Sequence, residues 1–261
     1  MRPIADYHTH TRYSHGTGTV RQNVRAAIEK GLSEVAITDH GPAMLFIGVD
    51  EPRWSLLIDE ARRVGREIRG GVGRDDDPAG SRRDGIRVLV GIEANVVGLD
   101  GTLDIPKRIA RELDIVLAGI HLQIRPKTLD DGLRLVWRNM TTARWSGSAA
   151  RRARIDNTKA LVEAVYRNRI DIITHPGLKV NIDTRELARA CAKRGTALEI
   201  NASHRRSDPE YVRVAAREGA MFAICSDAHS PDDVGRFDWA VHVAEKAGLQ
   251  ASQVINAARE S

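Results

Sequence analysis

Residues 87–93 read RVLVGIE, an unbroken run of mostly aliphatic residues that ends in a glutamate. Such a run is typical of a strand buried on both faces of a parallel sheet, because a strand with one exposed face alternates polar and apolar residues. Six more runs of this kind occur, at residues 4–8, 34–38, 114–120, 170–174, 197–200 and 221–225. The sequence therefore predicts seven strands in a parallel sheet.

Helical patterns lie between several of these runs. Residues 19–31 (TVRQNVRAAIEKG) and 183–195 (DTRELARACAKRG) each stop at a glycine, the residue that most often ends a helix. Residues 207–219 (SDPEYVRVAAREG) place Asp208 at a helix cap and Pro209 at the first helical position. Strands that alternate with helices in a chain of 261 residues predict an α/β protein, either a (β/α) barrel or a doubly wound sheet.

Side chains that can bind metal stand at the ends of the apolar runs. In chain order they are His8 and His10, His40, Glu93, His121, His175, and Asp227 with His229. In a (β/α) barrel the C-terminal ends of the strands meet on one face, which carries the active site. His8 and His10 are two residues apart and so point to the same side of an extended segment. Imidazoles grouped with carboxylates are typical ligands of first-row metals, and the sequence predicts a metal cluster.

Composition narrows the class of protein. No apolar run approaches the ~18–20 residues of a membrane span, and the N-terminus shows no secretory signal, so no membrane partner is expected. The only two cysteines, Cys191 and Cys225, exclude a disulfide framework and indicate the cytoplasm. A net charge of +5 permits an anionic partner, but the low aromatic content of 4% disfavours single-stranded nucleic acid. A small phosphorylated substrate suits this composition at least as well.

Two segments interrupt the pattern. Residues 69–85, rich in Gly, Asp and Arg, predict a solvent-exposed loop. A long arginine-rich connection runs from residue 123 to about residue 155. Because it follows a strand end, we expect it to overhang the metal site as a loop.

Seven motifs resemble, in their order, those of the PHP (polymerase and histidinol phosphatase) superfamily, and most closely its small stand-alone phosphatases of the YcdX type. They are HTHTRYSHG, ITDHG, GIEAN, GIH, THPG, EIN and SDAH, and they span the chain from His8 to about Ser230. The resemblance implies one PHP domain over residues 1–261. It also implies a distorted seven-stranded, TIM-like (β/α)7 barrel with the metal cluster at the C-terminal ends of its strands.

The resemblance further implies three divalent metal ions, expected to be zinc, with manganese or iron as alternatives. The first ion would be held by His8, His10, Glu93 and Asp227, and the second by Glu93, His121 and His175. The third would be held by His15, His40 and His229. Every family ligand position is filled by the expected residue type, which favours an active member.

We therefore expect a metal-dependent phosphatase that cleaves a small phosphomonoester by attack of a hydroxide bridging two metals, with Glu93 and Asp227 as catalytic residues. Arg12, or an arginine of residues 123–155, would bind the phosphate, because guanidinium pairs with phosphate in a bidentate manner. Asn201, Ser203 and His204 follow the sixth strand and are further candidate substrate contacts, with His204 or a metal-bound water as proton donor.

Three alternatives stay open at this point. The substrate could be histidinol phosphate specifically, because the superfamily includes a histidinol phosphatase. The chain could be a 3′–5′ exonuclease acting on DNA, or a non-catalytic accessory module that binds metal. The complete ligand set and the scarcity of aromatic residues disfavour the last two. The sequence gives no indication of the oligomeric state.

Overall fold

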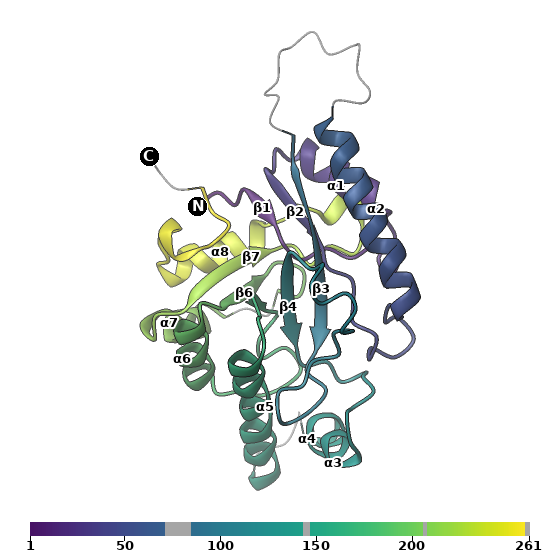
Figure 1. The fold of residues 1–261 in the computed structure, drawn as a ribbon. Helices are drawn as coiled ribbons and strands as arrows, with labels where there is room; N and C mark the ends of the chain where they lie inside the picture. Colours follow the sequence, from purple (N-terminus) through teal and green to yellow (C-terminus); the bar gives the residue numbers. More distant parts are fainter. Residues whose placement is uncertain (71–84, 143–146, 206–207, 259–261) are drawn as a thin grey trace.

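The computed structural model describes residues 1–70, 85–142, 147–205 and 208–258 (Figure 1). Within these residues, seven parallel strands follow one another in chain order across one sheet. They are β1 (Ala5–Asp6), β2 (Glu34–Ile37), β3 (Arg87–Asn95), β4 (Ile115–Gly119), β5 (Ile172–Ile173), β6 (Ala197–Asn201) and β7 (Met221–Cys225). A parallel bridge between Thr9 and Ala228 joins the two ends of the sheet. The predicted seven-stranded barrel is confirmed.

The strands β1 and β5 fall furthest short of the prediction, with two residues each where runs of five were expected. After β1 the main chain pairs partly with side chains, as where the N–H of Thr9 donates to Oγ1 of Thr38 at 3.0 Å. After β5 the backbone turns at His175, which has a φ of 27°. Both strands therefore end just before the residues that the sequence identified as metal ligands.

Helices surround the sheet in the arrangement of Figure 1. The longer ones are α1 (Val20–Glu29), α2 (Glu51–Arg69), α5 (Ser148–Arg167), α6 (Thr184–Arg194), α7 (Pro209–Arg217) and α8 (Asp238–Ala247). The three predicted helices are confirmed, with Asp208 as the N-cap of α7 and Gly195 as the C-cap of α6. The side chains of Thr19, Asp183 and Asp208 each accept a main-chain N–H of the first turn, which satisfies donors that a helix cannot pair internally.

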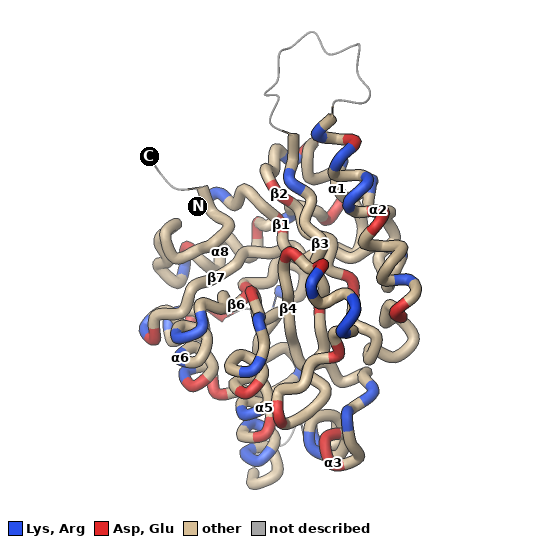
Figure 2. Tube along the Cα trace, viewed as in Figure 1, with Lys and Arg blue, Asp and Glu red and all other residues tan. Residues whose placement is uncertain are grey.

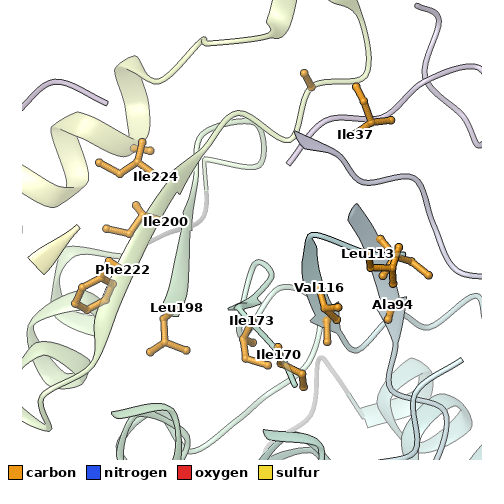
Figure 3. Close-up of a cluster of buried hydrophobic side chains, with 14 of the residues drawn as sticks. Ile37, Ala94, Leu113, Val116, Ile170, Ile173, Leu198, Ile200, Phe222 and Ile224 are labelled. Atoms are coloured by element: carbon orange, nitrogen blue, oxygen red, sulfur yellow. The ribbon is translucent and has the colours of Figure 1, made fainter. Parts of the chain in front are cut away.

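The barrel has two apolar clusters, one between the strands and the surrounding helices and one inside the ring of strands. The larger lies between strands and helices, and Figure 3 shows part of it, from Ile37 on β2 to Ile224 on β7. The smaller fills the interior with alternate strand residues, namely Ala36, Leu89, Ile115, Leu117, Ile172, Ala197, Ala223 and Cys225. Because side chains alternate along a strand, Glu93 faces inward like Leu89, and Glu199 like Ala197. The interior is thus apolar at one end and polar at the C-terminal end.

The connection at 123–155 is largely helical, so the expectation of a loop is wrong. It contains α3 (Leu129–Asp131), the π-helix η1 (Gly132–Trp137), α4 (Arg138–Thr142) and the start of α5. Arg134 and Arg138 both pair with Asp156 of α5, and the amides of Asn139 and Asn157 donate to each other. These contacts between distant segments stabilise the helices. The loop expected at 69–85 lies, apart from its ends, outside the described residues.

Short 3₁₀ turns complete the fold, η2 (Pro231–Asp233) and η3 (Ala251–Gln253). Within the described ranges, no helix combines the length and the hydropathy needed to cross a membrane.

Candidate metal centre

Closure of the barrel places His8 and His10, which follow the first strand, beside Asp227, which follows the last strand. The N–H of His10 donates to the carbonyl of Ala228 at 2.8 Å, and the N–H of Ala228 donates to the carbonyl of His8 at 3.2 Å. This seam places Nε2 of His8 3.5 Å, and Nε2 of His10 3.4 Å, from Oδ1 of Asp227. The two imidazole nitrogens are 3.2 Å apart. Three groups from opposite ends of the chain therefore face one point.

Glu93 lies at the centre of the site, and five imidazoles surround its carboxylate. Its Oε1 is 3.0 Å from Nε2 of His175 and 3.2 Å from Nε2 of His121. Its Oε2 is within 3.5 Å of one ring nitrogen each of His8, His10 and His40. A carboxylate with both oxygens facing different histidines has the arrangement of a bridging ligand.

The remaining candidates form the outer part of the cluster. Nε2 of His15 and Nε2 of His229 lie 2.5 Å apart, and the rings of both histidines lie within 5 Å of the ring of His10. The ring of His15 also stacks on that of His40 at 4.9 Å. The structure thus brings together all nine residues that the sequence singled out. Three groups have ligand atoms within 4.8 Å of one another: His8 with His10 and Asp227, His40 with Glu93 and His121, and His10 with His15 and His40.

Crowding among these groups sets their protonation. Burial, with His229 and His40 nearby, lowers the pKa of His15 to about 4, and burial likewise lowers the pKa of His10 well below its usual value. Burial would raise the pKa of Glu93, but the neighbouring histidines His8, His40 and His121 lower it well below the usual range. Neutral imidazoles beside ionised carboxylates are the donor set that divalent metals bind.

Unpartnered nitrogens test whether a metal fits these residues. Nδ1 of His10, His15 and His40 is buried without a hydrogen-bond partner within the described part of the chain. Nδ1 of His40 lies 2.8 Å from Oε2 of Glu93 but lacks the alignment of a hydrogen bond. Buried polar atoms without partners cost free energy. Because Nδ1 of His40 faces Glu93, coordination of a cation between the two would satisfy this atom, so the residues fit a metal cluster.

Asn95 and Asp39 contact the ligand candidates or their main chain from outside the cluster, and the sequence interpretation missed both. Oδ1 of Asn95 lies 2.8 Å from Nδ1 of His121, while its Nδ2 donates to Asp104 at 2.7 Å. An amide oxygen only accepts, so Nδ1 of His121 carries the proton and Nε2 is left with the free lone pair. Asp39 accepts from the main chain and hydroxyl of Thr11 at 2.8 and 2.6 Å, and so anchors the turn between His10 and His15.

Glu199 is a further buried residue that the sequence interpretation missed. Its Oε1 lies 2.7 Å from Nδ1 of His8. A signal was present, because Glu199 is a single carboxylate within an apolar run and has the inward parity of the neighbouring strand residues.

The candidate substrate contacts fall into separate places. Asn201 is buried and donates to Asp227 at 3.0 Å and to Glu199 at 3.1 Å, so both of its amide hydrogens are engaged. Nε2 of His204 lies 3.2 Å from Oδ2 of Asp227, with about a third of the side chain exposed. Asn201 and His204 line a cavity of about 60 Å³ beside His175. Ser203 instead lines a different cavity of about 320 Å³ with Arg205 and Trp239.

The candidate phosphate-binding arginines also differ in their surroundings, because within the described residues some form ion pairs with carboxylates and Arg12 does not. Arg134 and Arg138 are engaged with Asp156, and Arg154 with Asp183. Arg12 is exposed on the turn between two ligand candidates, and its guanidinium has no partner among the described residues.

The fold and the site together define a metal-binding (β/α) barrel with its ligands at the C-terminal ends of the strands. The chain belongs to the PHP domain family, whose model matches residues 6–203. The resemblance noted from the sequence is therefore confirmed. Asp227 and His229 lie beyond the matched range, on the segment that closes the barrel.

Named relatives extend the similarity to nearly the whole chain. The chain is 31% identical over 268 residues to a probable phosphatase of Thermoanaerobacter sp. (strain X514), covering 98% of this chain and 91% of the relative. It is 32% identical over 266 residues to a probable phosphatase of Caldanaerobacter subterraneus subsp. tengcongensis, covering 98% and 88%. Among solved structures, the fold is similar to that of histidinol phosphate phosphatase from Lactococcus lactis, with zinc, L-histidinol and phosphate. Its TM-score is 0.61 at 17% identity, covering 95% of each chain.

Proposed function

We propose that this protein is a metal-dependent phosphatase that hydrolyses a small phosphomonoester. The observation that carries the proposal is the convergence of five histidines on the carboxylate of Glu93, with Asp227, His15 and His229 grouped beside His10. Membership of the PHP family and the probable phosphatases among the relatives support the same reaction class.

Three divalent ions would be held by the groups that the sequence suggested. His8, His10, Glu93 and Asp227 would hold one ion, Glu93 with His121 and His175 a second, and His15, His40 and His229 a third. His40 also faces Glu93, so it stands between the second and third groups. Zinc is the proposed metal, because nitrogen-rich sites of this kind suit it and the Lactococcus enzyme was solved with zinc. Bound divalent ions neutralise phosphoryl oxygens and lower the pKa of water.

The chain's own residues would supply positioning and binding. Arg12 is the arginine that we assign to the phosphate, because its guanidinium makes no hydrogen bond or ion pair with the described residues and it lies between His10 and His15 in the sequence. Asn201 would hold Asp227 in place, since both of its amide hydrogens are taken by carboxylates. Nε2 of His204 donates to Oδ2 of Asp227 at the exposed edge of the centre, where this side chain would contact the leaving group.

Two observations favour a small ester over a nucleic acid. The cavity beside His175 and His204 measures about 60 Å³, which suits a compact alcohol. In the view of Figure 2, Lys and Arg are interspersed with Asp and Glu along the outer helices of the described residues, whereas a polynucleotide would need a continuous basic stripe. Histidinol phosphate is one specific candidate, since the Lactococcus neighbour was solved with its two products.

Both cysteines are buried and unpaired, which supports the cytoplasm as the compartment.

The experiment is phosphate release from a panel of phosphomonoesters, including histidinol phosphate and nucleotides, with zinc or manganese supplied. Asp227→Ala is the inactive control. Rapid turnover of one or a few small esters is expected. Failure of metal-loaded wild-type protein on every ester would reject the proposal, and cleavage of DNA from the 3′ end instead would identify the exonuclease.

A further inference from the structure

Glu199 is a buried carboxylate beside the metal centre that none of the three ligand groups includes. Its side chain is about 1% exposed, and carboxylates are almost never so buried unless they are paired. Three donors reach its two oxygens. Nδ1 of His8 lies 2.7 Å from Oε1, and Oε2 accepts from the N–H of His175 at 2.5 Å and from Nδ2 of Asn201 at 3.1 Å.

The contact with His8 fixes the chemistry of that imidazole. Because a carboxylate only accepts, Nδ1 of His8 must carry a proton, and Nε2 is then the nitrogen whose lone pair a bound metal would take. Nε2 is the nitrogen that faces the centre, 3.3 Å from Glu93 and 3.5 Å from Asp227. Glu199 therefore lies on the outer edge of the ring and selects the tautomer that can bind a metal through Nε2.

The contact with His175 acts on the backbone. A φ of 27° is unusual for a residue other than glycine, and the bond from the His175 N–H to Glu199 stabilises this turn. This backbone conformation places Nε2 of His175 3.0 Å from Oε1 of Glu93. One side chain thus orients ligands that belong to different ligand groups.

We propose that Glu199 is a positioning residue that fixes His8 and His175 together, so that the two metals on either side of Glu93 depend on it jointly. This inference rests on the metal centre assigned under the proposed function. Asn201 extends the connection, because the amide that donates to Glu199 also donates to Asp227.

Glu199→Gln tests the proposal because it keeps the size of the side chain but replaces one acceptor by a donor. If the amide nitrogen faces His8, the imidazole turns to the tautomer with its proton on Nε2 and can no longer bind a metal there. If it faces the other way, it meets two donors, the N–H of His175 and the amide of Asn201. Either arrangement loses one of the contacts that position the centre.

The measurement is zinc stoichiometry and affinity by titration and elemental analysis of the folded protein. Glu199→Gln should lower affinity about 10–100-fold, the usual effect of removing an outer partner of a ligand, and should lose two ions together. Glu34→Gln is the matched control, because Glu34 lies at the start of β2 and accepts from Tyr7 at 2.8 Å. Unchanged stoichiometry and affinity in Glu199→Gln would overturn the proposal.

A second measurement needs no substitution and so stands even if the variant fails to fold. Nitrogen-15 NMR of the zinc-loaded wild-type protein should show His8 protonated at Nδ1 and coordinated through Nε2. A proton on Nε2 of His8 would overturn the role of Glu199. Neither measurement depends on turnover, so absence of phosphatase activity would reject the proposed reaction without affecting this test.

Discussion

Nε2 of His10 lies 3.4 Å from Oδ1 of Asp227, at the seam where the segment after the last strand pairs with the segment after the first. The candidate metal centre is therefore complete only when the barrel closes. The main-chain bonds of the seam do not involve the side chains of these two residues. Ligand removal and barrel closure can consequently be separated by experiment.

His10→Ala and Asp227→Ala should each abolish phosphate release while the barrel stays folded. Loss of an outer partner costs about 10–100-fold in metal affinity or activity, so loss of a direct ligand should cost more than about 100-fold. Circular dichroism should be unchanged, and zinc content should fall. Asp232→Ala, which removes an exposed carboxylate of η2, is the control. Normal turnover in either ligand variant would refute the metal assignment.

Gly119→Ala should displace ligand candidates of the metal centre, because Gly119 lies next to them at the end of β4. A Cβ at this position would lie 2.4 Å from Oγ1 of Thr174, and 3.4 and 3.6 Å from the rings of His175 and His121. The added methyl must therefore displace the Thr174 side chain and shift one or both imidazoles. We expect reduced zinc affinity in a titration.

Gly195→Ala provides the comparison for that substitution. Gly195 has a φ of 71°, and a Cβ there would meet nothing within 4 Å, so the substitution should cost about 1 kcal/mol of backbone strain at the end of α6. Zinc affinity should stay at the wild-type value. Equal losses of affinity in both variants would mean that Gly119 acts through general stability.

Asn95→Leu should weaken metal binding at the group that contains His121. The substitution removes the acceptor 2.8 Å from Nδ1 of His121 and also leaves Asp104 without one of its donors. We expect a 10–100-fold loss of affinity for one ion, in contrast to the joint loss expected for Glu199→Gln. Cobalt substitution followed by absorption spectroscopy would report the change, and an unaltered spectrum with full cobalt content would contradict it.

The strands and eight of the nine ligand candidates were predictable because both signals are local, whereas His15 was assigned only from the family resemblance. An apolar run such as residues 87–93 marks a buried strand, and a polar residue at its end, such as Glu93, marks the face where such strands converge. The residues around Glu199 and Asn95 were harder to interpret. Their roles depend on hydrogen bonds to His8 and His121, which other strands contribute.

The helices at 129–142 were not predictable for a related reason. They are stabilised by contacts with α5, through Arg134 and Asp156 and through Asn139 and Asn157, whereas the exposed side chains include Leu129, Leu133 and Trp137. A local pattern with apolar residues facing solvent and polar residues facing a neighbour does not indicate a packed helix.

The metal-free protein should respond to acid through His15. The pKa of His15 is lowered to about 4 by burial and by His229 and His40, whereas in the unfolded chain it has the usual value of about 6.5. Below pH 6.5 the unfolded chain therefore binds more protons at this position. Its contribution to stability is fully present above pH 6.5 and is lost as the pH falls from there through about 4.

Comparison with His15→Gln isolates this effect from His8 and His10, which also titrate in the same site. Urea unfolding of both chelator-treated proteins at pH 7, 6, 5 and 4 should show the wild type losing stability relative to the variant on acidification. Above pH 6.5 the difference between the two should be constant. A difference that stayed constant down to pH 4 would show that His15 is protonated equally in the folded and unfolded chains, and the crowded arrangement of His15, His40 and His229 would then be wrong.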